Sequence, residues 1–283
     1  MEVGDFLTFI RFKNTTIIVL YVALFSSLIT RLINSNGLVL VVLSNILAIW
    51  AIYGFNDLED AKLEKGLKKG RKFIHKNMVL NGKIPENFAT VSIVLLAALS
   101  LIVASAIGLL NVYAILSILI IGFLYSSRYV RLKSKPPLDV LSHAIIGPLI
   151  PLGIFLNAGL NALFLVTLAS FFLGSLVPEI LNQRYDYSLD RKNNIRTTVQ
   201  LLGKALSLKL IMLLAFAIIA LNGIIFFLYG GLNLLLIYLL MSPLLIMFLH
   251  RRVRQLIEKK SIVLLIPVTV NLLMVLLGFF RLL

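Results

Sequence analysis

The chain contains no cysteine among its 283 residues and only three histidines, which are far apart in the sequence. Disulfide bonds, thiolate catalysis and cysteine-ligated zinc or iron–sulfur sites are therefore excluded. Charged residues are also scarce, at 14% of the chain, whereas 60% of the residues are hydrophobic. A soluble domain of this length could not bury so much apolar surface, so we expect most of the chain to lie in lipid.

Long apolar segments fill most of the sequence. They are continuous rather than alternating, which favours membrane-spanning helices over the strands of a barrel. The first segment is too long for a removable signal peptide and lacks a small-residue cleavage site. We predict an all-α integral membrane protein, with residues 1–283 as a single domain. Its nine transmembrane helices are expected near residues 15–34, 37–56, 87–109, 111–127, 138–157, 160–182, 207–229, 232–250 and 261–281.

The few charges lie on one side of the predicted membrane. All lysines and arginines except Arg31 and Arg281, and all 12 acidic residues, lie toward the side that holds the N-terminal segment and the connections after even-numbered helices. The positive-inside rule then places the N-terminus and the two polar loops, 57–86 and 183–206, in the cytoplasm, and the C-terminus outside. Membrane lipid accounts for part of the net charge of +15, and the placement argues against nucleic acid as a partner.

Two polar runs share one spacing: an Asn, an Asp four residues on, and an acid four residues beyond that. The first run has Asn56, Asp60 and Glu64, and the second has Asn182, Asp186 and Asp190. Residues four apart share a helix face, so each run is a stripe of oxygen ligands at the end of a membrane helix. The stripes follow the second and sixth helices, which suggests two related halves around a central cavity.

A single carboxylate at the membrane surface is usually a solvated helix end. That explanation fits the stripes poorly, because Asp57, Asp60 and Glu64 lie close enough to repel one another. A hard cation with oxygen ligands would remove the repulsion, and Mg²⁺ is favoured because it combines a few carboxylates with phosphate oxygens. Neighbouring lysines and arginines would hold the remaining phosphate oxygens. We therefore interpret the stripes as a split site for a divalent metal bound to diphosphate.

Other polar residues allow two interpretations. Tyr129 and Lys133 are four apart and could converge on one anion if their segment is helical, although a cytoplasmic loop with interfacial tyrosines is the simpler reading. His143 could act as a base, but an internally hydrogen-bonded histidine is more common. Glu179 is expected to face the cavity rather than lipid. Whether Glu179 takes part in chemistry is left open by the sequence.

The stripes resemble the signatures of the UbiA-type membrane prenyltransferases. The first signature, Asn-Asp-x-x-Asp-x-x-x-Asp, has Glu in place of its last Asp, and its counterparts here are Asn56, Asp57, Asp60 and Glu64. The second, Asp-x-x-x-Asp, is matched by Asp186 and Asp190. Softer resemblances lie in Asn77–Ile84, with Met78 where Pro is usual, in Tyr125–Asp139, with Arg128 and Tyr129 where two prolines are usual, and in Arg196-Thr197-Thr198.

The resemblance implies a UbiA-like fold and a Mg²⁺-dependent transfer of a prenyl group from a polyprenyl diphosphate to a lipophilic acceptor, with release of diphosphate. The acceptor would be an aromatic or quinone precursor or an isoprenoid lipid. The implied metal ligands are Asn56, Asp57, Asp60, Glu64, Asp186 and Asp190. The implied diphosphate contacts are Arg11, Asn56, Lys76, Asn77, Tyr129 and Arg131. The implied catalytic residues are Asp60, Asp186, Asp190, Lys133 and Tyr125.

This scheme needs no dedicated nucleophile, which suits a chain without cysteine. An aromatic face such as that of Tyr125 or Tyr129 can stabilise an allylic cation. Two other classes stay open. A secondary transporter of cations or phosphorylated solutes also uses repeats and acids, but places the acids near the midplane on interrupted helices. A non-catalytic lipid-binding protein would not release diphosphate.

Overall fold

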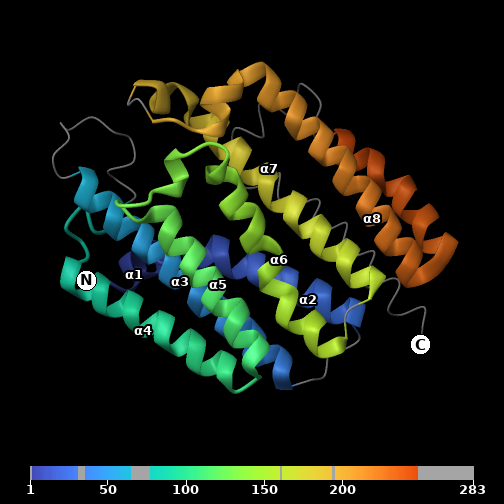
Figure 1. The fold of residues 1–283 in the computed structure, drawn as a ribbon, viewed down its shortest axis with the longest axis horizontal. Coiled ribbons are helices and arrows are strands. Elements are labelled where there is room, and N and C mark those ends of the chain that lie inside the picture. The colour runs from blue at the N-terminus through green and yellow to red at the C-terminus, as the bar shows by residue number, and fades with distance from the viewer. Residues whose placement is uncertain (1, 31–35, 65–76, 160, 193–194, 248–283) are drawn as a thin grey trace. The chain divides into compact units, whose positions relative to one another are not determined.

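The computed structural model describes residues 2–30, 36–64, 77–159, 161–192 and 195–247, which form helices and short turns (Figure 1). Six of the described helices are long and apolar enough to cross a membrane, and Thr15–Thr30 is a shorter apolar helix. The elements in order are α1 (Val3–Phe9), α2 (Phe12–Thr30), α3 (Asn36–Glu64), α4 (Glu86–Ser105), α5 (Leu109–Ser126), η2 (Leu132–Ser134), α6 (Leu138–Ala158), α7 (Ala162–Lys192) and α8 (Thr198–Met247).

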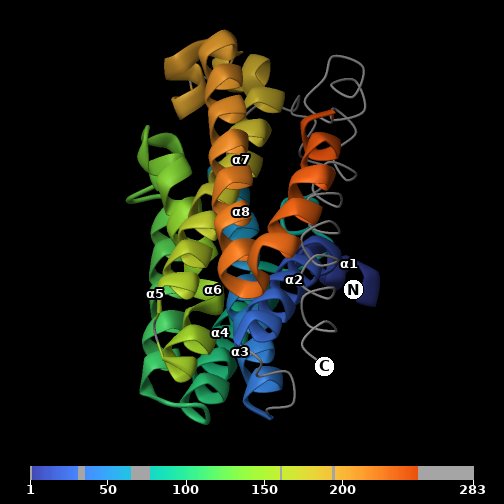
Figure 2. The same cartoon turned by 90° about the vertical axis from the view of Figure 1, so that its right-hand side faces the viewer.

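The all-α, multi-span prediction is confirmed for these residues. The predicted span 207–229 and the described part of the span 232–250, to residue 247, both fall on α8, which changes direction at Gly231, where φ is +70°. Glycine adopts this left-handed backbone without a steric penalty. The two limbs of α8 fold back beside each other (Figure 2), with the rings of Phe226 and Tyr238 4.9 Å apart. The ninth predicted helix, 261–281, lies outside the described residues, so the count of nine stays a prediction.

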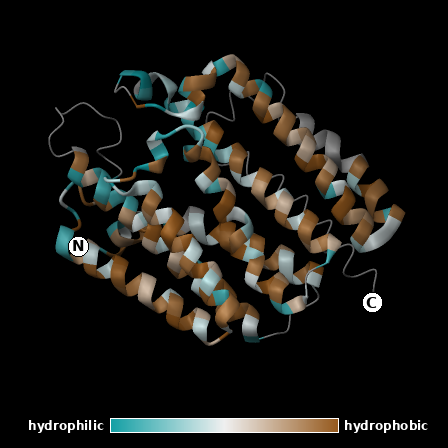
Figure 3. Cartoon of the chain, viewed as in Figure 1, coloured by the Kyte–Doolittle hydropathy of each residue, from teal (hydrophilic) through white to brown (hydrophobic). Residues whose placement is uncertain are grey.

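Both acidic stripes lie on helices that are longer than the hydrocarbon layer of a membrane is thick. At 1.5 Å per residue, the 29 residues of α3 and the 31 residues of α7 span about 43 Å and about 46 Å, against about 30 Å of hydrocarbon. Figure 3 shows the hydrophilic colour at one end of each helix. The predicted polar loops 57–86 and 183–206 therefore begin as helix, because the chain stays helical to Glu64 and to Lys192.

The chain divides into two compact units. The first comprises Met1–Ala23 and Asn34–Lys133, and the second comprises Leu24–Ile33 and Ser134–Leu283. The first stripe belongs to the first unit and the second stripe to the second unit. The single domain over 1–283 stays a prediction.

In the first unit, α3 packs against α4 and α5. Gly122 of α5 lets α5 approach closely, because a Cβ at this position would overlap the side chain of Ile52 on α3. Leu58, near the polar end of α3, packs in an apolar cluster that includes Phe9 and Ile84. Burying this face holds the other face of α3, with its acids, in a fixed orientation.

In the second unit, α7 packs against α6 and α8. Gly147 of α6 lies against Ser175 and the backbone of Phe171 on α7, so any larger residue would push the two helices apart. Val140, Ile180 and Val199 form an apolar cluster at the level where the three helices meet. The polar end of α7 begins directly above this cluster.

Candidate active site

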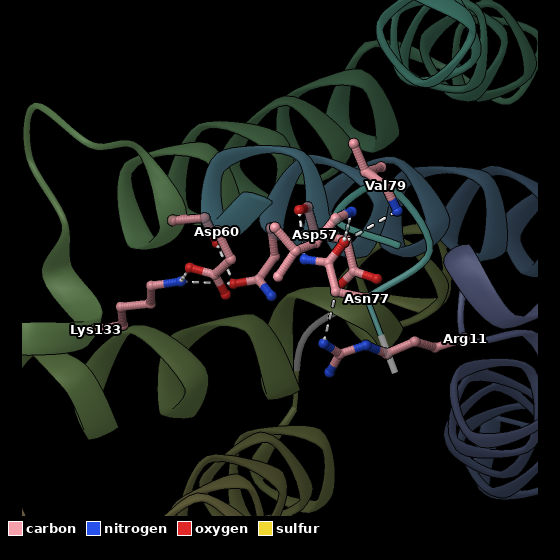
Figure 4. A network of polar contacts seen from close by, with 9 residues as sticks. Arg11, Asp57, Asp60, Asn77, Val79 and Lys133 are labelled. Carbon is pink, nitrogen blue, oxygen red and sulfur yellow. Dashed lines mark hydrogen bonds and ion pairs between the residues drawn. The ribbon is translucent and has the colours of Figure 1, made fainter. Parts of the chain in front are cut away.

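Two oxygens of the first stripe converge on one ammonium group. Lys133 Nζ donates to Asp60 Oδ1 at 2.5 Å and to Asn56 Oδ1 at 3.0 Å (Figure 4). Ser126 Oγ, at the end of α5, donates to the same Asn56 oxygen at 3.0 Å. The predicted helix face is therefore real: residues four apart on α3 present their oxygens to a common cation.

Asp57 is paired with Arg11 in the same region. Arg11 Nη2 lies 3.1 Å from Asp57 Oδ1, and the guanidinium lies 4.7 Å from the ring centroid of Tyr53. Arg11 has φ of +52° between α1 and α2. This conformation costs roughly 1–2 kcal/mol for a residue with a Cβ. The chain thus accepts a strained backbone at the position where Arg11 reaches α3.

These pairs correct one step of the sequence argument. Clustered acids without a counter-ion would repel, but here each described acid of the first run has a basic partner: Arg11 for Asp57, Lys133 for Asp60, and Lys62 for Glu59. Burial lowers the pKa of the Lys133 ammonium from its usual value, and the neighbouring Asp60 opposes that shift. Relief of repulsion is therefore not by itself a reason to invoke a metal.

Asn77 is engaged in local structure. Its Nδ2 donates to the backbone oxygen of Asp57 at 2.7 Å, and its Oδ1 accepts from the backbone N–H of Val79 and of Leu80 at 3.0 and 2.9 Å. The side chain therefore fixes the turn before α4 to the polar end of α3. Its predicted contact with diphosphate stays a prediction. Lys76 lies outside the described residues, as does the side chain of Glu64.

The segment between α5 and α6 is not an α-helix, although Tyr129 and Lys133 could converge on one anion only if it were. The backbone N–H of Arg131 donates to Ser127 O at 2.7 Å, but Arg131 has φ of +48° and only a 3₁₀ turn follows. Tyr129 is 83% exposed, with the Arg128 guanidinium 5.0 Å from its ring centroid, whereas Lys133 points to α3. Helical spacing therefore does not bring Tyr129 and Lys133 together. Tyr125 lies half-buried at the end of α5.

Glu59 is a buried acid that the sequence argument missed. Its Oε2 accepts from the backbone N–H of Arg128 at 3.0 Å, and its Oε1 lies 3.3 Å from Lys62 Nζ. The contact ties the turn after α5 to α3, and Lys133 reaches the stripe from the end of this turn. Lys62, three residues on, is the only sequence signal for this role, and the spacing is common on exposed helices.

In the second unit, Asp186 and Asp190 lie four residues apart on α7, and both are half-buried. Two hydrogen bonds join this end of α7 to Ile195 and Gln200. Ile195 N–H donates to Asp190 O at 2.9 Å, and Gln200 Nε2 donates to Tyr187 O at 2.5 Å. These bonds hold the start of α8 against the end of α7, so the backbone that carries the second stripe is anchored on both sides.

A buried carboxylate organises the same region one turn deeper. Asp139, at the start of α6, is 0% exposed and accepts from Gln183 Nε2 at 2.9 Å and from the backbone N–H and hydroxyl of Thr198. Gln183 Oε1 accepts from Val199 N–H at 3.1 Å. Asp139 and Thr198, which lie 59 residues apart, therefore join α6 to α7 and α8.

The oxygen atoms of the first stripe are suitable ligands for a hard divalent cation. Asn56 and Asp60 direct oxygens at a positive centre, which the ammonium of Lys133 occupies, and oxygen ligands are those that Mg²⁺ prefers. Among the described residues, no three histidine or acidic side chains gather closely enough to hold a metal ion alone.

A family model for the UbiA prenyltransferase family matches residues 15–273, so the chain belongs to this family and is a multi-pass membrane protein. Among solved structures, it resembles a UbiA homolog from Archaeoglobus fulgidus bound to GPP and Mg²⁺, with 22% identity and a TM-score of 0.71. The same homolog bound to DMAPP and Mg²⁺ matches with 20% identity and a TM-score of 0.69.

A structure described as digeranylgeranylglyceryl phosphate synthase matches with 18% identity and a TM-score of 0.67. In all three cases the match covers 98% of this chain and 98% of the other. At these identities the likeness establishes the fold. No curated protein matches the sequence closely enough to add a relative.

Proposed function

We propose that this member of the UbiA prenyltransferase family transfers a prenyl group from a polyprenyl diphosphate to a lipophilic acceptor and releases diphosphate in a Mg²⁺-dependent reaction. The observation that carries the proposal is the convergence of Asn56 and Asp60 on one cationic centre, with Arg11 beside the adjacent Asp57. Oxygen ligands for a metal and basic groups for phosphate thus occur side by side at the end of a membrane helix.

The metal would be held by Asn56, Asp57 and Asp60 of α3 and by Asp186 and Asp190 of α7, with Glu64 in support. When bound, Mg²⁺ supplies positive charge to the departing diphosphate. Each of these residues offers oxygen alone, which suits a hard cation.

The basic residues near the first stripe would bind the phosphate oxygens. The charged groups of Arg11 and Lys133 are already held beside α3 by ion pairs, so they lose little freedom when a phosphate binds. Arg131, two residues before Lys133, would join them. Negative charge grows on the diphosphate as the allylic C–O bond breaks, and fixed cations stabilise that state more than the ground state. Tyr125, half-buried at the end of α5, would present its ring to the allylic cation.

The prenyl chain is expected among the apolar helices, with its diphosphate at the polar ends of α3 and α7. By the distribution of basic residues, these ends lie on the cytoplasmic side of the cell membrane. A reporter fused within the Lys62–Lys83 segment or after Arg254 should be cytoplasmic, and one fused after Leu283 should be outside. A cytoplasmic C-terminus would mean that the number of spans is even.

The acids favour an enzyme over a transporter, because they lie at the ends of continuous helices rather than on interrupted helices near the midplane. The deciding assay combines purified protein, Mg²⁺, several labelled prenyl diphosphates and a membrane lipid extract. An enzyme releases diphosphate and forms a new prenylated lipid, and both should stop when EDTA removes the metal. Binding of the diphosphate without its consumption would contradict the proposal.

A further inference from the structure

One pair of ionisable side chains inside membrane helices has no part in the reaction as proposed so far. His143 lies on α6 and Glu179 on α7, with Nε2 3.5 Å from Oε2. Both residues lie within segments that are long and apolar enough to span a membrane. Ionisable residues in such segments are costly and commonly mark functional sites. The pair therefore calls for an account beyond packing.

The two partners are unequally buried. The His143 side chain is 32% exposed, whereas that of Glu179 is 11% exposed. Glu179 Oε1 accepts from Gln183 Nε2 at 3.3 Å, and the same Nε2 donates to the buried Asp139. An accessible imidazole oriented by a buried and tethered carboxylate is the arrangement of a general base. A distance of 3.5 Å is long, as is common for catalytic contacts without substrate.

The depth of the pair suits the lipophilic substrate. Glu179 precedes Asp186 by seven residues on α7, or about 10 Å along the helix axis. It therefore lies on the bilayer side of the second stripe. If the diphosphate lies at the stripe, as proposed above, an acceptor that enters from the bilayer reaches the allylic carbon from this side.

We propose that His143, oriented by Glu179, accepts the proton that the acceptor loses when it is prenylated; this inference rests on the proposed function. The C1–O bond of the allylic diphosphate breaks, and its electron pair leaves with the diphosphate. An electron pair of the acceptor forms the new bond to C1. The displaced proton passes to the imidazole of His143, and then to solvent. The acceptor must therefore carry a hydrogen on the attacked atom, as a hydroxyl or an aromatic C–H does.

The test separates bond breaking from capture of the cation. Purified His143→Gln and Glu179→Gln are incubated with Mg²⁺, several prenyl diphosphates labelled at C1, and a membrane lipid extract. Prenylated lipid, prenyl alcohol and diphosphate are then measured. We expect the prenylated lipid to fall by about 10²-fold or more. Diphosphate release should fall much less, because water captures the cation instead, so the ratio of alcohol to prenylated lipid rises. In His143→Ala, added imidazole should restore the prenylated lipid.

The matched control is Asn222→Ala, which breaks a buried contact between α7 and α8: Ser170 Oγ donates to Asn222 Oδ1 at 2.7 Å. This variant should keep the ratio of the unaltered protein. If the prenylated lipid and diphosphate release fall together in His143→Gln and Glu179→Gln, or if neither changes, the proton-acceptor role is wrong. If the unaltered protein releases no diphosphate and makes no prenylated lipid, the proposed function itself fails, and this inference fails with it.

Discussion

The polar ends of α3 and α7 carry the same spacing of oxygen ligands but are held in place by different chemistry. On α3, the carboxylates of Asp57 and Asp60 are each paired with a basic residue from another segment. The end of α7 is instead held by Asp139 of α6, which lies deeper and receives its hydrogen bonds from amide and hydroxyl donors. An ion pair can exchange its partner for another charged group, whereas a buried carboxylate that is hydrogen-bonded to neutral donors keeps its partners. We therefore expect the side chains at the end of α3 to change partners when ligands bind, and those around Asp139 to keep theirs.

The largest expected effect tests whether the two stripes nevertheless share one role. Asp60→Asn and Asp186→Asn should each reduce product formation by about 100-fold or more, about 2.7 kcal/mol of transition-state stabilisation, because each removes a charged ligand. Initial rates at saturating Mg²⁺ measure the loss, and size-exclusion profiles in detergent check the fold. Near-normal product formation by either variant would end the assignment of both stripes to one metal–diphosphate site.

Stability should separate the two regions. Asp139→Asn replaces an acceptor with a donor among buried donors, at a cost of about 1–3 kcal/mol for each donor left unsatisfied. We expect a lower Tm in detergent and a protein that is difficult to purify. Ser170→Ala, which removes one neutral hydrogen bond in the same unit, is the control and should cost about 1 kcal/mol. An unchanged Tm in Asp139→Asn would mean that the hydrogen bonds to Asp139 do not stabilise the second unit, and the proposed difference between the two regions would be wrong.

A smaller effect is expected from Lys133→Met. The variant loses a phosphate contact, so KM for the prenyl diphosphate should rise about tenfold, as charged hydrogen bonds contribute about 1.5–3 kcal/mol. The Mg²⁺ concentration for half-maximal rate should fall, since Asn56 and Asp60 lose their competing cation. Titrations of rate against each ligand measure both changes.

The control for Lys133→Met is Lys83→Met, which breaks an exposed ion pair with Asp5 in the same unit. Exposed pairs are screened by solvent and contribute little, so neither titration should shift. Equal shifts in the two variants would mean that net charge, rather than the place of Lys133, controls metal and diphosphate binding.

The smallest effect is expected at Glu64, where the chain departs from the family signature. Glu has one more methylene than Asp, so we expect an outer ligand that tunes metal affinity. Glu64→Asp should stay active with a changed Mg²⁺ requirement, and Glu64→Gln should lose less activity than Asp60→Asn. A Glu64→Gln protein as inactive as Asp60→Asn at every Mg²⁺ concentration would make Glu64 a primary ligand.

The spans and the stripes could be predicted because both depend on local spacing. Hydropathy marks a helix within one segment, and residues four apart share a face whatever the rest of the chain does. The turn at Gly230-Gly231 could also be predicted, because glycine tolerates the backbone that α8 adopts there.

The partners of the acids could not be predicted, because they come from distant segments. Arg11 lies 46 residues from Asp57, and Lys133 lies 73 residues from Asp60. The family resemblance assigned Arg11 to the diphosphate and Lys133 to catalysis, but local spacing paired neither residue with an acid of α3. Glu59 and Asp139 were missed for the same reason: an acid at a helix end is usually solvated, and only the fold shows that these two are buried.

If metal and diphosphate bind at the first stripe as proposed, the pairing of Lys133 with Asp60 would make their binding cooperative. If only the metal bound, Asp60 would bind the metal, and the partly buried ammonium of Lys133 would lose its counter-ion. If only the diphosphate bound, Lys133 would bind the phosphate, and the carboxylate of Asp60 would lose its counter-ion. When both bind, each charge of the broken pair finds a new partner. Linkage then requires that each ligand tightens the binding of the other by the same factor. The ion pair would thus favour binding of the metal and the diphosphate together over binding of either one alone.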